Sequence, residues 1–277
     1  MSPKPPERVA PAAAGDRACR SGAIAVAERA HGAGTGVPAD AAGDAPPLPV
    51  HDVVRKIREE FDWDAVLPPR ARTVRWRVEQ RVKRGMDVVV SLAGLIVLAP
   101  LFLALAVLVR LTSAGPVLYP WRVLGHRARP FVGYKFRTMV PNADELKRDL
   151  LAHNQMRGPV FKMRNDPRVT PVGRWLRKFS LDELPQLWSV LKGDMSLVGP
   201  RPPSAEEFAA FEPWQRGKLA VTPGITCLWQ VQGRSEIADF NEWAALDLEY
   251  IRRWSLWLDL KILLKTIPVV IRGRGAY

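Results

Sequence analysis

An uncharged apolar run of twenty-two residues extends from Val88 to Val109, with a proline near its middle at Pro100. A straight helix of this length is just long enough to cross a hydrocarbon core of about 30 Å. Proline lacks a backbone donor and clashes with the preceding turn, so we expect the helix to kink or break near Ala99. The twelve residues before the break rise only about 18 Å. The run therefore predicts a re-entrant segment that enters one leaflet and returns. A single straight span is the alternative.

Basic residues flank both ends of this run. Residues 70–84 contain seven Lys or Arg and one acid, Glu79, and six more Lys or Arg follow between Arg110 and Arg137. Lys and Arg near membrane segments remain on the cytoplasmic side. We therefore predict that the chain lies at the cytoplasmic membrane, in contact with inner-membrane lipid, with both ends of the run and the following domain facing the cytoplasm.

The remaining chain divides by composition. Residues 1–50 carry five basic and five acidic side chains and no aromatic residue, so the net charge of +13 lies after them. Such a segment cannot bury a core, and 1–69 is predicted to be a disordered extension, with a short amphipathic helix within 52–66. A basic lead-in and the re-entrant helix occupy 70–110, and a catalytic domain occupies 111–277. No nucleic-acid-binding motif accompanies the positive charge, so no nucleic acid partner is predicted.

The patterns after residue 110 indicate an α+β, mainly helical class. Residues 117–137 carry β-forming residues around a Gly-His-Arg-Ala-Arg-Pro turn, which predicts a small β-hairpin. Residues 142–155 are expected to be helical, with Asn142 as a possible N-cap. Residues 254–273 mix Trp and Leu with Lys and Arg, which fits either an interfacial amphipathic helix or an ordinary core helix.

The polar residues that carry chemistry are densest between 166 and 201. Asp182 and Glu183 are adjacent carboxylates that follow several cations. Ionised carboxylates of this kind act as nucleophiles or hold Mg²⁺ through oxygen. The structural alternative is a capping box with Ser180 as N-cap and Glu183 three residues later. Arg201 stands between two prolines, a rigid setting that suits recognition of phosphate.

Several strings in this region and beyond it recur in the order found in one family. The chain closely resembles the bacterial sugar transferases, the monotopic phosphoglycosyl transferases that initiate exopolysaccharide or O-antigen assembly. The resemblance extends from about Arg81 to Tyr277. The strings that carry it are Lys135-Phe-Arg-Thr-Met139, Asp166-Pro-Arg-Val-Thr170, Ser180-Leu-Asp-Glu-Leu-Pro-Gln186, Lys192-Gly-Asp-Met-Ser-Leu-Val-Gly-Pro-Arg-Pro202, Thr222-Pro-Gly-Ile-Thr226, Trp229-Gln-Val231 and Gly233-Arg234.

This resemblance implies transfer of a hexose 1-phosphate, with glucose or galactose expected, from a UDP-sugar to undecaprenyl phosphate with release of UMP. Asp182 would form an aspartyl-phosphosugar intermediate, and Glu183, possibly with Asp182, would hold Mg²⁺. The resemblance also implies a re-entrant helix. The substrate and phosphate contacts that it suggests are Lys135, Arg137, Asp166, Asp194, Arg201, Gln230 and Arg234.

Three points remain open at this stage. The family often has Ser-Pro at the membrane break, whereas this chain has Ala99-Pro100, which leaves the kink geometry undetermined. A rival function is a membrane-tethered basic scaffold that binds anions without catalysis. The sequence allows a homo-oligomer but does not specify one.

Overall fold

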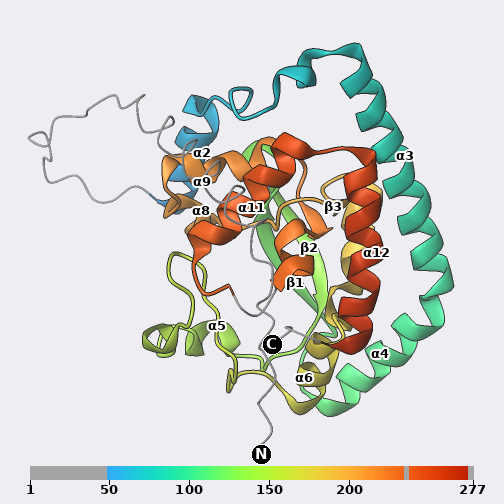
Figure 1. Cartoon of the computed structure of the whole chain (residues 1–277). Helices are drawn as coiled ribbons and strands as arrows, with labels where there is room; N and C mark the ends of the chain where they lie inside the picture. Colours follow the sequence, from blue (N-terminus) through green and yellow to red (C-terminus); the bar gives the residue numbers. More distant parts are fainter. Residues whose placement is uncertain (1–48, 234–236, 274–277) are drawn as a thin grey trace, which may run out of the picture. The chain divides into compact units, whose positions relative to one another are not determined.

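The computed structural model describes residues 49–233 and 237–273, in which helices predominate over two small sheets (Figure 1). This confirms the mainly helical α+β class. The helices are α2 (Val50–Glu60), α3 (Val74–Val97), α4 (Ala99–Thr112), α5 (Ala143–Leu146), α6 (Pro171–Lys178), α7 (Leu187–Lys192), α8 (Ala205–Ala209), α9 (Pro213–Arg216), α10 (Leu228–Gly233), α11 (Phe240–Arg253) and α12 (Leu256–Arg272). Short 3-10 helices occupy Pro69–Arg72, His126–Ala128, Leu151–His153, Leu181–Gln186 and Gly217–Ala220. The strands are β1 (Leu118–Leu124), β2 (Pro130–Phe136), β3 (Ser196–Val198) and β4 (Gly224–Thr226).

The apolar run forms two helices with a sharp bend between them. α3 ends at Val97, α4 begins at Ala99, and the two axes differ by 61°. Pro100 lies in the first turn of α4, where its missing N–H is tolerated. The predicted break near Ala99 is confirmed. Within the described ranges no single helix has the length and apolar character to cross a membrane, whereas this bent pair meets both criteria when taken together.

The predicted hairpin is confirmed as an antiparallel pair of β1 and β2, in which Tyr119 faces Lys135 and Trp121 faces Gly133. A second sheet joins β3 and β4 in parallel. Two glycines allow the backbones to approach closely at the end of this sheet, because a Cβ on Gly224 would lie 2.1 Å from the backbone nitrogen of Gly199. Gly199 lies two residues before Arg201, so this contact holds the backbone next to Arg201 in place.

The N-terminal helix α2 belongs to the hydrophobic core. Val54 and Ile57 are buried from one face of α2, and Trp63 is buried beyond its end. They pack in one cluster with Phe208 of α8 and Phe211. The expected short amphipathic helix is therefore present, and the boundary of the extension at residue 69 differs from the structure, because folded elements begin at Val50. The predictions for residues 1–48 concern residues outside the described ranges.

A buried polar network joins the bent helices to the rest of the fold. Lys83 of α3 forms an ion pair with Asp259 of α12, with 2.5 Å between Nζ and Oδ2. The Lys83 ammonium also donates to the carbonyl of Val198 at the end of β3. The hydroxyl of Tyr250 and the indole N–H of Trp254 donate to the same Asp259 carboxylate. Burial and the negative charge of Asp259 raise the pKa of Tyr250 well above its ordinary value, so its hydroxyl remains a donor.

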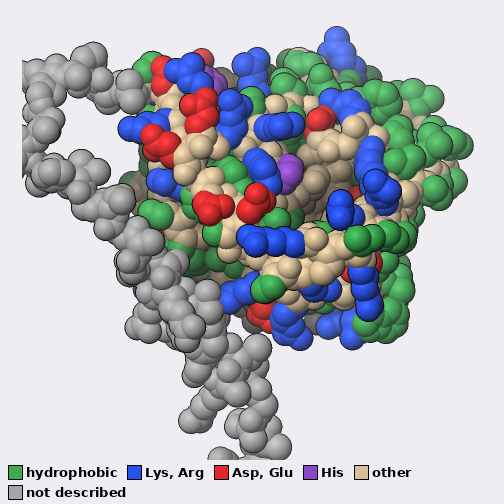
Figure 2. Space-filling view, turned by 90° about the horizontal axis from the view of Figure 1, so that it is seen from above, with side chains coloured by type: hydrophobic (Ala, Val, Ile, Leu, Met, Phe, Trp, Pro, Cys, Tyr) green, Lys and Arg blue, Asp and Glu red, His purple; other side chains and the backbone are tan. Residues whose placement is uncertain are grey.

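The C-terminal helix α12 has one face buried in the core and one exposed apolar face. Asp259 and Ile262 are buried against the core, which is the core-helix reading. Exposed large apolar side chains cover the other side of the helix. These are Trp257, Leu260, Leu264, Ile267 and Ile271. Pro268 lies within the helix without ending it. Figure 2 shows hydrophobic side chains gathered at the right edge of the molecule, the side on which α3 and α12 run in Figure 1.

The helix expected over 142–155 is wrong for most of its length. α5 ends at Leu146, and Asn142 makes no side-chain cap hydrogen bond. The guanidinium of Arg168 donates to the carbonyl of Ala143, which ties the first turn to a distant loop. The chain then continues through turns to the 3-10 helix at Leu151–His153.

Candidate active site

The two adjacent acids lie on the short 3-10 helix Leu181–Gln186, which packs against β2. Ser180, directly before this helix, has a left-handed backbone with φ of 52° and provides no side-chain cap. The capping-box alternative is therefore wrong. Pro185 lies within the helix and removes a donor that an α-helix would need. Asp182 is buried, and the Glu183 side chain is only 12% exposed.

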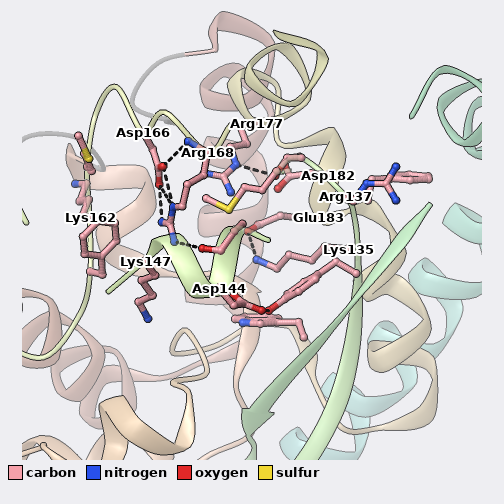
Figure 3. A pocket seen from close by; sticks show the side chains of 18 of the residues that line it. Lys135, Arg137, Asp144, Lys147, Lys162, Asp166, Arg168, Arg177, Asp182 and Glu183 are labelled. Atoms are coloured by element: carbon pink, nitrogen blue, oxygen red, sulfur yellow. Dashed lines mark hydrogen bonds and ion pairs between the residues drawn. The ribbon is translucent and has the colours of Figure 1, made fainter. Parts of the chain in front are cut away.

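Glu183 forms ion pairs with two cations from different elements. The Lys135 ammonium on β2 lies 2.9 Å from Glu183 Oε1 (Figure 3). The Arg201 guanidinium lies 3.6 Å from the same oxygen. Burial lowers the pKa of Lys135, and the neighbouring Glu183 charge opposes that shift only in part. A lysine in this state loses its proton more readily than an exposed one.

A third cation, Arg177, reaches the same region from α6. Its Nε donates to the hydroxyl of Thr138, 2.9 Å away. Burial lowers the pKa of Arg177, while the charge of Asp182 opposes the shift, which indicates that the two side chains interact. α6 approaches closely because Gly173 lacks a side chain: a Cβ there would lie 2.0 Å from the Thr138 carbonyl oxygen.

Asp166 and Arg168 form a rigid corner at the side of the site. Two nitrogens of the Arg168 guanidinium contact the Asp166 carboxylate, and the Arg168 backbone N–H donates to it as well. Burial raises the pKa of Asp166, but these hydrogen bonds outweigh it and hold the pKa below its ordinary value. Asp166 is therefore ionised and already engaged with Arg168, which favours an organising role for this pair.

These groups surround a cavity of about 460 Å³. Six of the predicted site residues line it, contributed by β2 and the residue after it, the 3-10 helix and two loops. They are Lys135, Arg137, Asp166, Asp182, Glu183 and Arg201. The structure therefore brings together both predicted catalytic acids and three predicted cations in one hollow. Figure 2 shows Lys and Arg side chains around a hollow on the face that it displays.

Arg137 lines the cavity, but its guanidinium has other partners. It donates to the carbonyl oxygens of Ser113 and Pro116 and to the Ser113 hydroxyl, directly after α4. Figure 3 shows Arg137 apart from the acids. This geometry favours a contact with the C-terminal end of α4 over the anion contact that the sequence suggested.

Two further predicted contacts lie outside the cavity lining. Asp194 pairs with Lys192 in its own turn, at 2.7 Å. Gln230 is buried and accepts a hydrogen bond from the backbone N–H of Cys227, where α10 begins. Both interactions are local and explain these residues without a substrate. Arg234 lies outside the described residues.

Three of the cavity-lining residues, Arg168, Arg177 and Trp121, were not assigned to the site from the sequence. Arg168 and Arg177 were noted only as neighbouring cations, although both line the cavity. Trp121 also lines it and was not singled out. Its position opposite a glycine and near Lys135 follows from the hairpin register, so the predicted hairpin contained a usable signal.

The donor set can be compared with the requirements of Mg²⁺. In phosphate-binding enzymes this ion is commonly held by one or two carboxylates together with substrate phosphates and water. The adjacent Asp182 and Glu183 carboxylates fit that requirement. Among the residues described, no group of three or more His, Cys, Asp or Glu side chains could hold a metal ion alone.

Comparison with known proteins gives a consistent result. Residues 78–273 match the family model described as "Bacterial sugar transferase". The galactosyl transferase CpsE of Streptococcus agalactiae is 45% identical over 70% of this chain and 43% of its own length. The undecaprenyl-phosphate galactose phosphotransferase of Salmonella typhimurium is 43% identical over 73% of this chain and 43% of its own. The exopolysaccharide production protein ExoY of Sinorhizobium fredii is 41% identical over 70% of this chain and 88% of its own.

This chain thus aligns with less than half of the first two relatives and with most of the third. The aligned part contains all the cavity-lining residues discussed above, since they fall within 78–273. The chain belongs to the bacterial sugar transferase family.

Proposed function

We propose that this protein transfers a hexose 1-phosphate from a UDP-sugar to undecaprenyl phosphate and releases UMP, which initiates assembly of a polysaccharide. The observation that carries the proposal is the cavity in which Asp182 and Glu183 lie beside Lys135, Arg177 and Arg201. Both substrates are anionic, and cations around a shared cavity offset their mutual repulsion. The names of the Streptococcus and Salmonella relatives favour galactose, and glucose is the other hexose expected.

The chemistry that we propose divides into two displacements at one phosphorus atom. A carboxylate oxygen of Asp182 attacks the sugar-linked phosphorus, and the bond to the UMP oxygen breaks, so UMP leaves with the electron pair. A phosphate oxygen of the lipid then attacks the same phosphorus, and the Asp182 carboxylate is regenerated. Lys135, Arg177 and Arg201 would stabilise the charge that develops on the phosphoryl oxygens.

Glu183, with Asp182, would hold Mg²⁺, and the ion would supply neutralisation of the diphosphate charge. Lys135 and Arg201 contact the same oxygen of Glu183 here, at 2.9 and 3.6 Å, and a divalent cation on this carboxylate would weaken both contacts. The donor phosphates provide the alternative acceptors for both cations. This exchange of partners supports a site that binds the ion and the donor together.

The bent pair α3 and α4 supports a location at the cytoplasmic membrane. A lipid phosphate lies in the headgroup plane and a UDP-sugar is soluble, so the enzyme needs its site at their boundary. A re-entrant anchor keeps the catalytic domain on the cytoplasmic side. The bend of 61° and the exposed apolar faces of α3, α4 and α12 support such an anchor.

The test uses the full chain in lipid nanodiscs with UDP-galactose or UDP-glucose that carries ³²P in the sugar-linked phosphate. Without acceptor, we expect labelled protein and one UMP per labelled chain; addition of undecaprenyl phosphate should move the label to lipid. Asp182→Asn should lose the labelled protein, whereas Asp52→Asn on α2, far from the cavity lining, should retain it. Tight UDP binding without any UMP release would favour the scaffold alternative.

A further inference from the structure

Trp121 occupies an unusual position on the hairpin. It lies on β1 opposite Gly133, so no side chain faces it directly across the strand pair. Its ring is partly exposed and lines the cavity. Lys135 is its diagonal neighbour on the same face of the hairpin, because Lys135 pairs with Tyr119, two residues before Trp121. Diagonal pairs of this kind are within reach of long side chains.

The ring of Trp121 lies near both cations that bind Glu183. The Lys135 ammonium is 3.9 Å from the ring centroid, and the Arg201 guanidinium carbon is 5.4 Å from it. Both distances fall within the range of about 6 Å over which the negative face of an indole attracts a cation. Two cations from distant parts of the chain therefore share one aromatic ring and one carboxylate.

Glu183 and the Trp121 ring differ in how many N–H donors of the two cations they leave available for a phosphate. Glu183 neutralises charge and accepts a hydrogen bond from Lys135, so it competes with a phosphate for these cations. The indole ring attracts the cation without accepting its in-plane N–H groups. A guanidinium near the ring therefore keeps its fork of donors for a phosphate.

We infer that Trp121 is a positioning residue that keeps Lys135 and Arg201 at the donor diphosphate while their contacts with Glu183 are exchanged. This inference rests on the proposed function for the identity of the donor. It concerns anion binding, however, and therefore can be measured separately from turnover. The ligand class is the diphosphate group of a nucleoside diphosphate.

The experiment measures equilibrium binding of UDP and of uridine to the full chain in nanodiscs, by calorimetry. Loss of two cation–ring contacts in Trp121→Leu should weaken UDP binding by about 5- to 30-fold and leave uridine binding unchanged. Trp121→Phe, which retains an aromatic face, should recover part of the loss. Trp214→Leu on α9, which does not line the cavity, is the matched control and should match the wild type.

Fluorinated tryptophans inserted only at position 121 provide a test that keeps the shape of the side chain. Each added fluorine weakens the negative face of the ring, so UDP affinity should fall stepwise while the melting temperature stays constant. A flat response, or an equal loss of UDP and uridine binding, would overturn the inference. If the wild type binds UDP but releases no UMP from UDP-sugars, the proposed function fails while the positioning role is still measured.

Discussion

The buried pair between Lys83 and Asp259 supports a quantitative stability prediction. The two side chains are 12% and 3% exposed and lie 2.5 Å apart. Asp259 also accepts from Tyr250 at 2.7 Å and Trp254 at 3.1 Å, and Lys83 donates to Val198 at 2.9 Å. Removing one partner of a buried pair leaves an uncompensated charge, which typically costs about 3–5 kcal/mol. For a domain of this size, that loss corresponds to a fall in Tm of about 6–20 °C.

The variants are Asp259→Asn, Lys83→Met and the double change, assayed by thermal and urea unfolding of the detergent-solubilised chain. Each single variant should lose free energy of unfolding by the amount above. The double variant should lose much less than the sum, because neither charge is then left unpaired. Strict additivity, or single losses below about 1 kcal/mol, would show that the pair contributes no more than an exposed one. Arg75→Met, which breaks an exposed pair with Glu79, is the control and should change little.

Three further outcomes test other parts of the structure. Burial lowers the pKa of Lys135, so this side chain loses its proton at a lower pH than an ordinary lysine does. The KM for the donor should therefore rise at alkaline pH, and Lys135→Arg, which stays charged, should remove that rise. Gly173→Ala places a Cβ 2.0 Å from the Thr138 carbonyl oxygen, so Tm should fall by several degrees in a melting assay, as overpacking costs about 1–3 kcal/mol; an unchanged Tm would refute the close packing. Pro100→Ala should reduce the bend between α3 and α4. A cysteine placed after α4, in a Cys19→Ser background, should then react with an impermeant thiol reagent from outside intact cells. In the parent with Pro100, the same cysteine should react only after permeabilisation.

Much of the local structure followed from periodicity and from proline chemistry. Pro100 specified the break because a missing N–H and a steric clash act within one turn of the chain. The hairpin followed from the β-forming runs around residues 125–130. The helix expected after Asn142 stopped early, because Ala143 is tied by Arg168 from a loop that is distant in sequence. Contacts of that kind have no signature in local spacing.

The candidate site was predictable where the chemistry was local and less so where it depended on packing. Asp182 and Glu183 are adjacent in sequence, and the cavity contains both. Arg137 was expected at phosphate on the same grounds as Lys135, but it lies just beyond the end of β2, and its guanidinium is held by Ser113 and Pro116 after α4. Trp121 required the register of the hairpin, and hence a tertiary argument, before its proximity to two cations was evident.

The short spacing between Lys135 and Arg137 has a mechanical consequence. Lys135 contacts Glu183 in the cavity, and Arg137 donates hydrogen bonds to residues directly after α4. A single buried residue, Phe136, lies between them. The two contacts are only two residues apart, so a displacement of the end of α4 would be transmitted to the Lys135 ammonium. In the proposed membrane-anchored enzyme, lipid thickness and curvature would thereby influence binding of the soluble donor.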